Sequence, residues 1–241
     1  MSVHLALGTV SPRQVHAAVV GAGEVPGSPG WWVASHLEIR DFFAYVALAL
    51  GTKLFAPSPA LAVAHEKRKS SGKHGGEQGA LWRSAATDGA NAYRRWATGN
   101  TGLPLVDAAM RELVTTGYCS SRARQNAASV LTKDLCVDWR AGAALFQFLL
   151  ADHDVGSNFG NWAYFSGVGF DPKNRHYRSI SQAIKYDPCG AYVRRWLPAL
   201  REASDAEALW PFDGAVPGWP EPIVAPRTQL SYPDAVERFG E

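Results

Sequence analysis

Apolar side chains recur every three or four residues along most of the chain, the spacing of helices that bury one face. The clearest example is 103–117, whose apolar positions are Val106, Ala109, Met110, Leu113 and Val114. The same pattern predicts helices over 11–23, 35–51, 120–135 and 139–152. No series of alternating strands is found. The sequence therefore predicts an all-α fold.

Turn and capping residues mark the ends of these segments. Ser11 and Pro12 form a typical N-cap and first-turn pair, and Gly51 ends the second helix. The apolar positions along that second helix are Leu37, Phe42, Tyr45, Val46 and Leu48.

Two stretches depart from the helical pattern. Residues 65–80 are rich in Gly, Lys and Ser without an apolar anchor, so we expect a mobile basic loop. From Pro211 onward, Pro and Gly recur often enough to predict an irregular C-terminal tail over 211–241. We therefore expect a single helical domain over 1–210, followed by that tail.

Composition narrows the class of protein. A hydrophobic content of 46% with 19% charged residues is ordinary for a soluble globular protein. The net charge of +2 does not by itself imply a nucleic-acid partner, although a local basic face stays open. Three cysteines without a CxxC spacing fit a reducing compartment without disulfides or a zinc site. With no signal-peptide pattern and only the short apolar run FFAYVALAL, we expect a soluble intracellular protein without membrane insertion.

The stretch LLADHDVGSNFGNW (149–162) carries the densest candidate chemistry. Asp152 and Asp154 repel each other unless a cation compensates, and Arg124 on the preceding predicted helix could pair with one of them. Asn158 offers a donor and an acceptor, which suits a heterocyclic ring edge. These residues alone favour the simpler interpretation of an ion pair between adjacent helices with an Asn turn.

Other site types lack support in the sequence. No convergent ligand pattern predicts a metal, and neither a GxSxG elbow nor a glycine-rich phosphate loop occurs. The chain has nine tryptophans, and Trp82, Trp96, Trp139 and Trp162 lie around the acidic stretch. Buried indoles can relay an electron from a photoexcited cofactor, but any single one is more often core.

Four long motifs carry a family resemblance: GNTGLPLVDAAMRELVTTGY, SSRARQNAASVLTKDLCVDWRAGA, DHDVGSNFGNWAYFSGVGFDP and YDPCGAYVRRWLPAL. They resemble the FAD-binding helical domain of photolyases and cryptochromes, with details closest to the DASH-type cryptochromes. The likeness runs in order from about Leu5 to Leu200.

The resemblance implies FAD as the cofactor. It places Arg124 and Asp152 in a buried ion pair beside the flavin, and Asp154 as acceptor of its N3–H. It places Asn158 near N5, and Arg40, in EIRDFF, as the flavin-side arginine.

The same resemblance implies an electron-transfer chain. Trp162 and Trp139 would be its proximal and middle members, and Trp82 is the best candidate for the distal one.

It also implies a pocket for a flipped DNA lesion, since a base inside the stack cannot reach the flavin. Gln125 and Tyr164 would line this pocket, and Arg122 would contact the lesion or its phosphate. The chain departs from the family here: His36 replaces a Glu that hydrogen-bonds the lesion, Ile39 replaces a stacking Trp, and Ser121 replaces an Asn. Loss of a stacking aromatic typically costs about 1–3 kcal/mol per base.

The family's N-terminal antenna domain is not in the sequence, which begins almost at HLALGTVSPR, so no antenna chromophore is expected. Of the Thr/Ser stretch that usually holds the FAD phosphates, only Ser2 is present. The surface where the antenna domain docks is a candidate site for a protein partner.

Three hypotheses remain. The first is a light-responsive FAD protein that transfers electrons to flavin under blue light, either a DNA photolyase acting on single-stranded or lesion-containing DNA or a photoreceptor. The altered lesion pocket leaves open whether it is an enzyme. The alternative is a degenerate photolyase fold that serves as a structural or interaction subunit of a larger complex. The last is non-specific nucleic-acid binding through HEKRKSSGK and the Arg-rich helix.

Overall fold

The computed structural model describes residues 1–23, 25–58, 82–170, 175–212 and 214–239. Within these ranges the chain is built from helices, and the β-type pairing consists of one isolated bridge between Arg83 and Val137. The predicted all-α fold is confirmed. The basic loop predicted over 65–80 lies outside the described residues.

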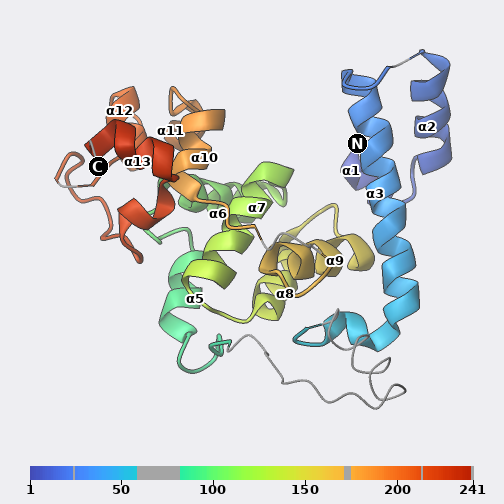
Figure 1. Ribbon diagram of the computed structural model, residues 1–241, viewed down its shortest axis with the longest axis horizontal. Coiled ribbons are helices and arrows are strands. Elements are labelled where there is room, and N and C mark those ends of the chain that lie inside the picture. The colour runs from blue at the N-terminus through green and yellow to red at the C-terminus, as the bar shows by residue number, and fades with distance from the viewer. Residues whose placement is uncertain (24, 59–81, 171–174, 213, 240–241) are drawn as a thin grey trace.

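The N-terminal helices form one side of the molecule (Figure 1). They are α1 (Ser2–Ala6), α2 (Pro12–Gly21) and α3 (Pro29–Leu50), followed by the 3₁₀ turn η1 (Gly51–Phe55). As predicted, Ser11 caps α2, in a capping box with Gln14. Gly51 ends α3 at φ 53°, a conformation that glycine adopts without a Cβ clash.

Five α-helices make up the middle of the molecule. They are α5 (Ala90–Ala97), α6 (Pro104–Thr116), α7 (Ser121–Ser129), α8 (Trp139–Leu149) and α9 (Val155–Ser166). A π-helical turn, η2 (Val130–Asp134), continues α7, so the segment predicted as one helix over 120–135 changes its hydrogen-bond register half-way. α9 packs between α3 and α8. Gly160 permits the first contact, because a Cβ there would come within 2.3 Å of the Phe43 ring.

The C-terminal side holds α10 (Ser179–Tyr186), α11 (Ala191–Trp196), η3 (Pro198–Leu200), α12 (Asp205–Leu209), η4 (Pro226–Gln229) and α13 (Tyr232–Phe239). The prediction of an irregular tail over 211–241 is therefore wrong for its last part. Ser231 Oγ accepts from Asp234 N at the start of α13, and Arg238 of that helix lies 4.1 Å from the Trp210 ring. A cap and a cation–π contact thus order a segment that looks irregular in composition.

The segment before α13 is also anchored to the helical body. Gln229 is fully buried; its Nε2 donates to Asp134 Oδ1, and its Oε1 accepts from the backbone and hydroxyl of Ser179. Phe212 and Leu230 are buried with it. The C-terminal segment is therefore part of the folded body.

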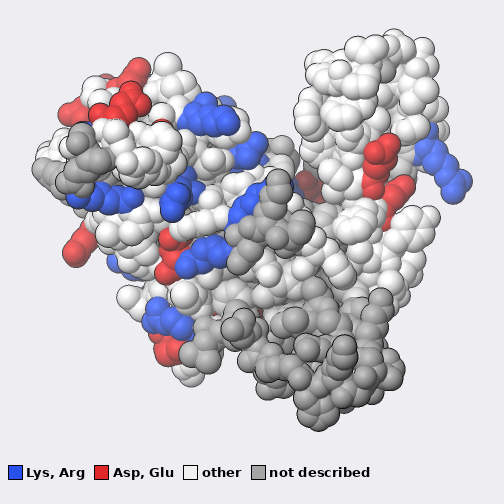
Figure 2. Space-filling model, viewed as in Figure 1, with Lys and Arg blue, Asp and Glu red and all other residues white. Residues whose placement is uncertain are grey.

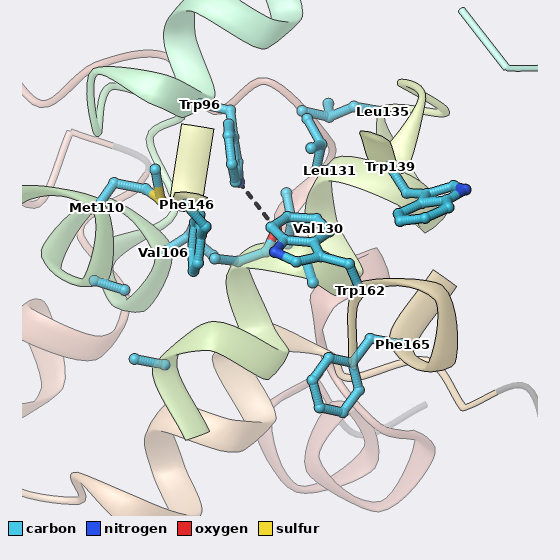
Figure 3. Packing of buried hydrophobic residues seen from close by; sticks show 14 of the residues in the cluster. Trp96, Val106, Met110, Val130, Leu131, Leu135, Trp139, Phe146, Trp162 and Phe165 are labelled. Carbon is cyan, nitrogen blue, oxygen red and sulfur yellow. Dashed lines mark hydrogen bonds between the residues drawn. The ribbon is translucent and has the colours of Figure 1, made fainter. Parts of the chain in front are cut away.

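The main core lies where α5–α9 meet. Figure 3 shows Trp96, Phe146 and Trp162 packed against Val106, Met110 and Leu131. Trp96 and Trp139 are completely buried. Burying side chains of this size contributes most of the hydrophobic stabilisation of such a core.

Helix α3 presents a second apolar face outward. Leu37 and Phe43 are buried as helical packing requires, but Phe42, Tyr45 and Leu48 are 49%, 72% and 80% exposed. Periodicity places these residues on the helix correctly, but it does not distinguish the buried face from the exposed one.

Candidate functional site

The site is built around the N-terminus of α9. Asp154 is the N-cap of this helix, and its Oδ1 accepts from Ser157 N at 2.8 Å. Ser157, Asn158, Asn161 and Trp162 follow at steps of three and four residues and line one cavity. The unusual spacing in DHDVGSNFGNW is thus that of one helix face.

A charged pair closes the site beside this helix. Arg124 Nη2 donates to both carboxylate oxygens of Asp152, at 3.0 and 2.9 Å, and its Nε donates to the carbonyl of Cys119 at 2.8 Å. The Asp152 side chain is only 5% exposed. Burial is the largest single influence and lowers the pKa of Arg124, but the hydrogen bonds and charge interactions with Asp152 and Cys119 together outweigh it, and the net shift is upward. The predicted buried ion pair is therefore present, and its guanidinium stays charged.

An inner cavity of about 270 Å³ opens between α7, α8 and α9. Its polar lining includes Ser2, Arg124, Asp152, Asp154, Asn158 and Asn161. Asn158 Nδ2 donates to the Ala143 carbonyl at 2.9 Å, so its Oδ1 is left as the acceptor. The cavity also borders Cys119, where burial raises the thiol pKa to about 12; this cysteine is not a nucleophile.

Two further cavities adjoin the inner one. The amino-terminal cavity, about 480 Å³, lies between α1 and α3 and is lined by Ser2, Trp32, His36, Arg40 and Asp154 among others. The outer cavity, about 500 Å³, lies between α3, α7 and α9. Ser157 borders all three, so the cavities lie next to one another.

The structure places the predicted pocket residues as follows. His36, Ile39, Ser121, Gln125 and Tyr164 line the outer cavity, together with Arg40.

Arg122 stands apart from them. It is exposed, stacks on the Tyr186 ring at 4.3 Å and donates to Gln125 Oε1 at 2.9 Å. In this arrangement it orients Gln125 and presents positive charge beside the cavity.

The three predicted redox tryptophans lie at different depths. Trp162 is buried in the inner cavity wall, against Phe146 at 5.1 Å and Trp96 at 6.0 Å. Trp139 is completely buried; its Nε1 donates to Pro57 O at 3.0 Å and its ring lies 6.2 Å from Phe159.

Backbone pairing joins the segment that holds Trp82 to the segment that leads into Trp139. Arg83 N donates to Cys136 O at 2.7 Å, and Asp138 N donates to Arg83 O at 3.1 Å. Trp82 directly precedes Arg83, Trp139 directly follows Asp138, and Trp82 is half-buried.

Two contributors were missed at the sequence level: Ser157 and Asn161. A third, Trp96, stands among the tryptophans around the acidic stretch, but the sequence assigns it no role. The first two stand three and seven residues after Asp154, so helical periodicity counted from the N-cap could have found them. Trp96 carries no comparable local signal, because its contact with Trp162 joins residues 66 positions apart in the sequence.

Among the described residues, no group of three or more His, Cys, Asp or Glu could hold a metal ion. Nor does any helix there have the length and apolar character needed to cross a membrane.

The chain matches the family model of the FAD-binding domain of DNA photolyase over residues 32–236. It belongs to this photolyase and cryptochrome family. The cryptochrome DASH of Danio rerio is 41% identical over 211 residues, which cover 86% of this chain and 37% of that protein. The cryptochrome DASH of Natronomonas pharaonis is 38% identical, over 91% of this chain and 45% of that protein.

Solved structures of a cryptochrome and a photolyase are also similar to this chain. A Synechocystis cryptochrome matches 98% of this chain with a TM-score of 0.78 and 34% identity, over 47% of its own chain. An archaeal photolyase from Sulfolobus tokodaii, solved with two FAD molecules, matches 98% with a TM-score of 0.74 and 27% identity, over 49% of its chain. The chain thus spans less than half the length of these relatives.

Proposed function

We propose that this chain binds FAD across the adjacent inner and amino-terminal cavities and reduces it under blue light with electrons drawn through tryptophan. The observation that carries the proposal is Trp162, a buried indole in the wall of a cavity whose polar residues suit a flavin edge. A purely structural role gives no reason for this combination.

The polar groups that line the two cavities suit the flavin and its phosphates. The Asn158 oxygen is an acceptor, and Asp154 keeps one carboxylate oxygen beyond its bond to Ser157. Such acceptors match the N–H positions of an isoalloxazine ring, and the Arg124–Asp152 pair supplies a fixed charge beside them. Ser2 and Arg40 line the amino-terminal cavity, where a hydroxyl and a guanidinium suit the phosphates. Bound FAD would supply light absorption and one-electron redox chemistry.

DNA is the partner that we propose for the outer cavity. Lys and Arg side chains gather over α7, α10 and α11 in Figure 2. Arg122 and Lys185 flank the Tyr186 ring at 4.3 and 5.3 Å, beside the cavity that Gln125 lines. This arrangement suits a DNA backbone with one base turned into the cavity. Ile39 in the wall gives weaker stacking than an aromatic would, so we expect weak lesion binding.

FAD titration of the apoprotein, followed by flavin fluorescence, tests the cofactor site. Asn158→Leu removes the ring-edge acceptor and is expected to weaken FAD binding about tenfold, the equivalent of one hydrogen bond. Asn100→Leu, on an exposed residue after α5, is the matched control and should bind FAD like the parent. If the parent protein takes up no FAD, the proposed function is wrong.

A salt series tests the DNA proposal. Binding of single-stranded DNA should weaken as salt rises, and the double variant Arg122→Gln, Lys185→Gln should show a shallower salt dependence because fewer phosphates are neutralised. DNA binding that is absent even at low salt would exclude this partner.

A further inference from the structure

Trp162 has a second aromatic neighbour, which leads out of the core toward α5. The Trp96 ring lies 6.0 Å from the Trp162 ring at 79°, and the Tyr93 ring lies 5.8 Å from Trp96. Figure 3 shows Trp96 and Trp162 in the same buried cluster. Because Tyr93 and Trp96 stand three residues apart on one helix, α5 fixes their separation.

The three rings run from the cavity wall to the surface. Trp162 is 3% exposed and Trp96 is completely buried, whereas Tyr93 is half-buried. Centroid separations near 6 Å place neighbouring rings in contact. Electrons pass readily between aromatic rings in contact, so the series is a continuous path.

Protonation gives the path a direction. The Trp96 Nε1–H donates to the Ala127 carbonyl at 2.9 Å, and an amide carbonyl is too weak a base to remove the proton. An oxidised Trp96 therefore stays a radical cation, which is a strong oxidant.

The phenol at the end of the series behaves differently. Burial raises the pKa of Tyr93, so it is protonated at neutral pH. Its Oη donates to Ala141 O across a long 3.4 Å, and its half-buried position gives water access for a departing proton.

We propose that Trp162, Trp96 and Tyr93 form a second electron-transfer route that ends in a tyrosyl radical. The proposal rests on the proposed function, because Trp162 must first give up an electron to photoexcited FAD. Trp96 then passes one electron to Trp162, and Tyr93 passes one to the Trp96 radical cation. As Tyr93 is oxidised its O–H bond breaks and the proton goes to water. A soluble thiol later returns one electron and one proton to Tyr93.

This route starts from a different side of Trp162 than the route through Trp139 and Trp82. The route through Trp139 and Trp82 runs past Phe159 and the bridge between Arg83 and Val137. The two routes share Trp162 alone, so either can be blocked without touching the other.

The test uses FAD-loaded protein with the predicted route blocked by Trp139→Phe. After blue-light illumination, electron paramagnetic resonance should show a tyrosyl signal while the flavin bands bleach slowly. Adding Tyr93→Phe, which removes one hydroxyl and keeps the ring, should abolish the tyrosyl signal and further slow the bleaching. Adding Tyr232→Phe instead, on an exposed tyrosine of α13, should change neither.

The outcomes separate the two proposals. If the parent protein binds FAD but no flavin band bleaches in light, the proposed function fails. If the parent bleaches but the Trp139→Phe protein shows no tyrosyl signal, or keeps that signal after Tyr93→Phe, the second route is overturned.

Discussion

At the scale of single residues, the buried negative charge of Asp152 is compensated mainly by one partner, Arg124. The carboxylate is nearly inaccessible to water, and both of its oxygens accept hydrogen bonds from the Arg124 guanidinium. The repulsion between two acids at a helix end predicts that Arg124 pairs with one of them, and the family resemblance implies that this one is Asp152. The sequence cannot predict the added bond from Arg124 Nε to the Cys119 carbonyl, which depends on how the chain enters α7.

Arg124→Met should therefore destabilise the fold as well as the site. It leaves a buried carboxylate unpaired, which typically costs about 3–5 kcal/mol. Urea unfolding of the apoprotein measures this loss. The double variant Arg124→Met, Asp152→Leu removes both charges and should recover part of it; a double variant no more stable than the single one would contradict this account.

Asp107 gives a prediction about pH. It is buried at the start of α6, and burial raises its pKa from 3.8 to about 6, although Thr101 and Gly102 donate to it. Because the folded-state pKa is the higher one, this group's stabilising contribution is complete below about pH 4 and is lost as pH rises through about 6.

The non-titrating variant Asp107→Asn isolates this contribution. The unfolding free energy of the parent minus that of the variant should fall by on the order of 3 kcal/mol from about pH 4 to about pH 7. Chemical denaturation at several pH values measures it. A difference that is constant or rises with pH would show that the hydrogen bonds, and not burial, dominate this carboxyl.

At the scale of elements, the contact between α8 and α9 positions Trp162. Gly142 makes it possible, because a Cβ there would lie 2.3 Å from Trp162 Cη2 and 2.7 Å from Leu131 Cδ2. A glycine inside a predicted helix indicates that another part of the chain packs close to it, but the sequence does not show which residues these are. The helices and their caps could be predicted from the local sequence pattern. The contact between α8 and α9 could not, because it depends on tertiary packing.

Gly142→Ala should thus displace the Trp162 ring although alanine favours helices. We expect a loss of about 1–3 kcal/mol from overpacking, together with weaker photoreduction of bound FAD. Gly21→Ala, at the end of α2 where nothing lies within 4 Å of the added Cβ, is the matched control and should be neutral or stabilising. Thermal unfolding and flavin bleaching measure the two effects, and equal behaviour of both variants would contradict the packing argument.

At the scale of the whole molecule, three cavities meet at Ser157, and segments far apart in the sequence line them. The long motifs made the fold and much of the site predictable. The outward apolar face of α3 and the ordered α13 were not, because the first depends on which neighbours the helix has and the second on a cap at Ser231.

Photoreduction of FAD through Trp162 is tested most directly by the absorption spectrum of the FAD-loaded protein before and after blue light. We expect the oxidised flavin bands to bleach in the parent protein, and we expect Trp162→Phe, which blocks both routes at their shared start, to abolish the bleaching while FAD stays bound. Bleaching at the parent rate in Trp162→Phe would contradict the account, because the flavin would then draw its electrons from elsewhere.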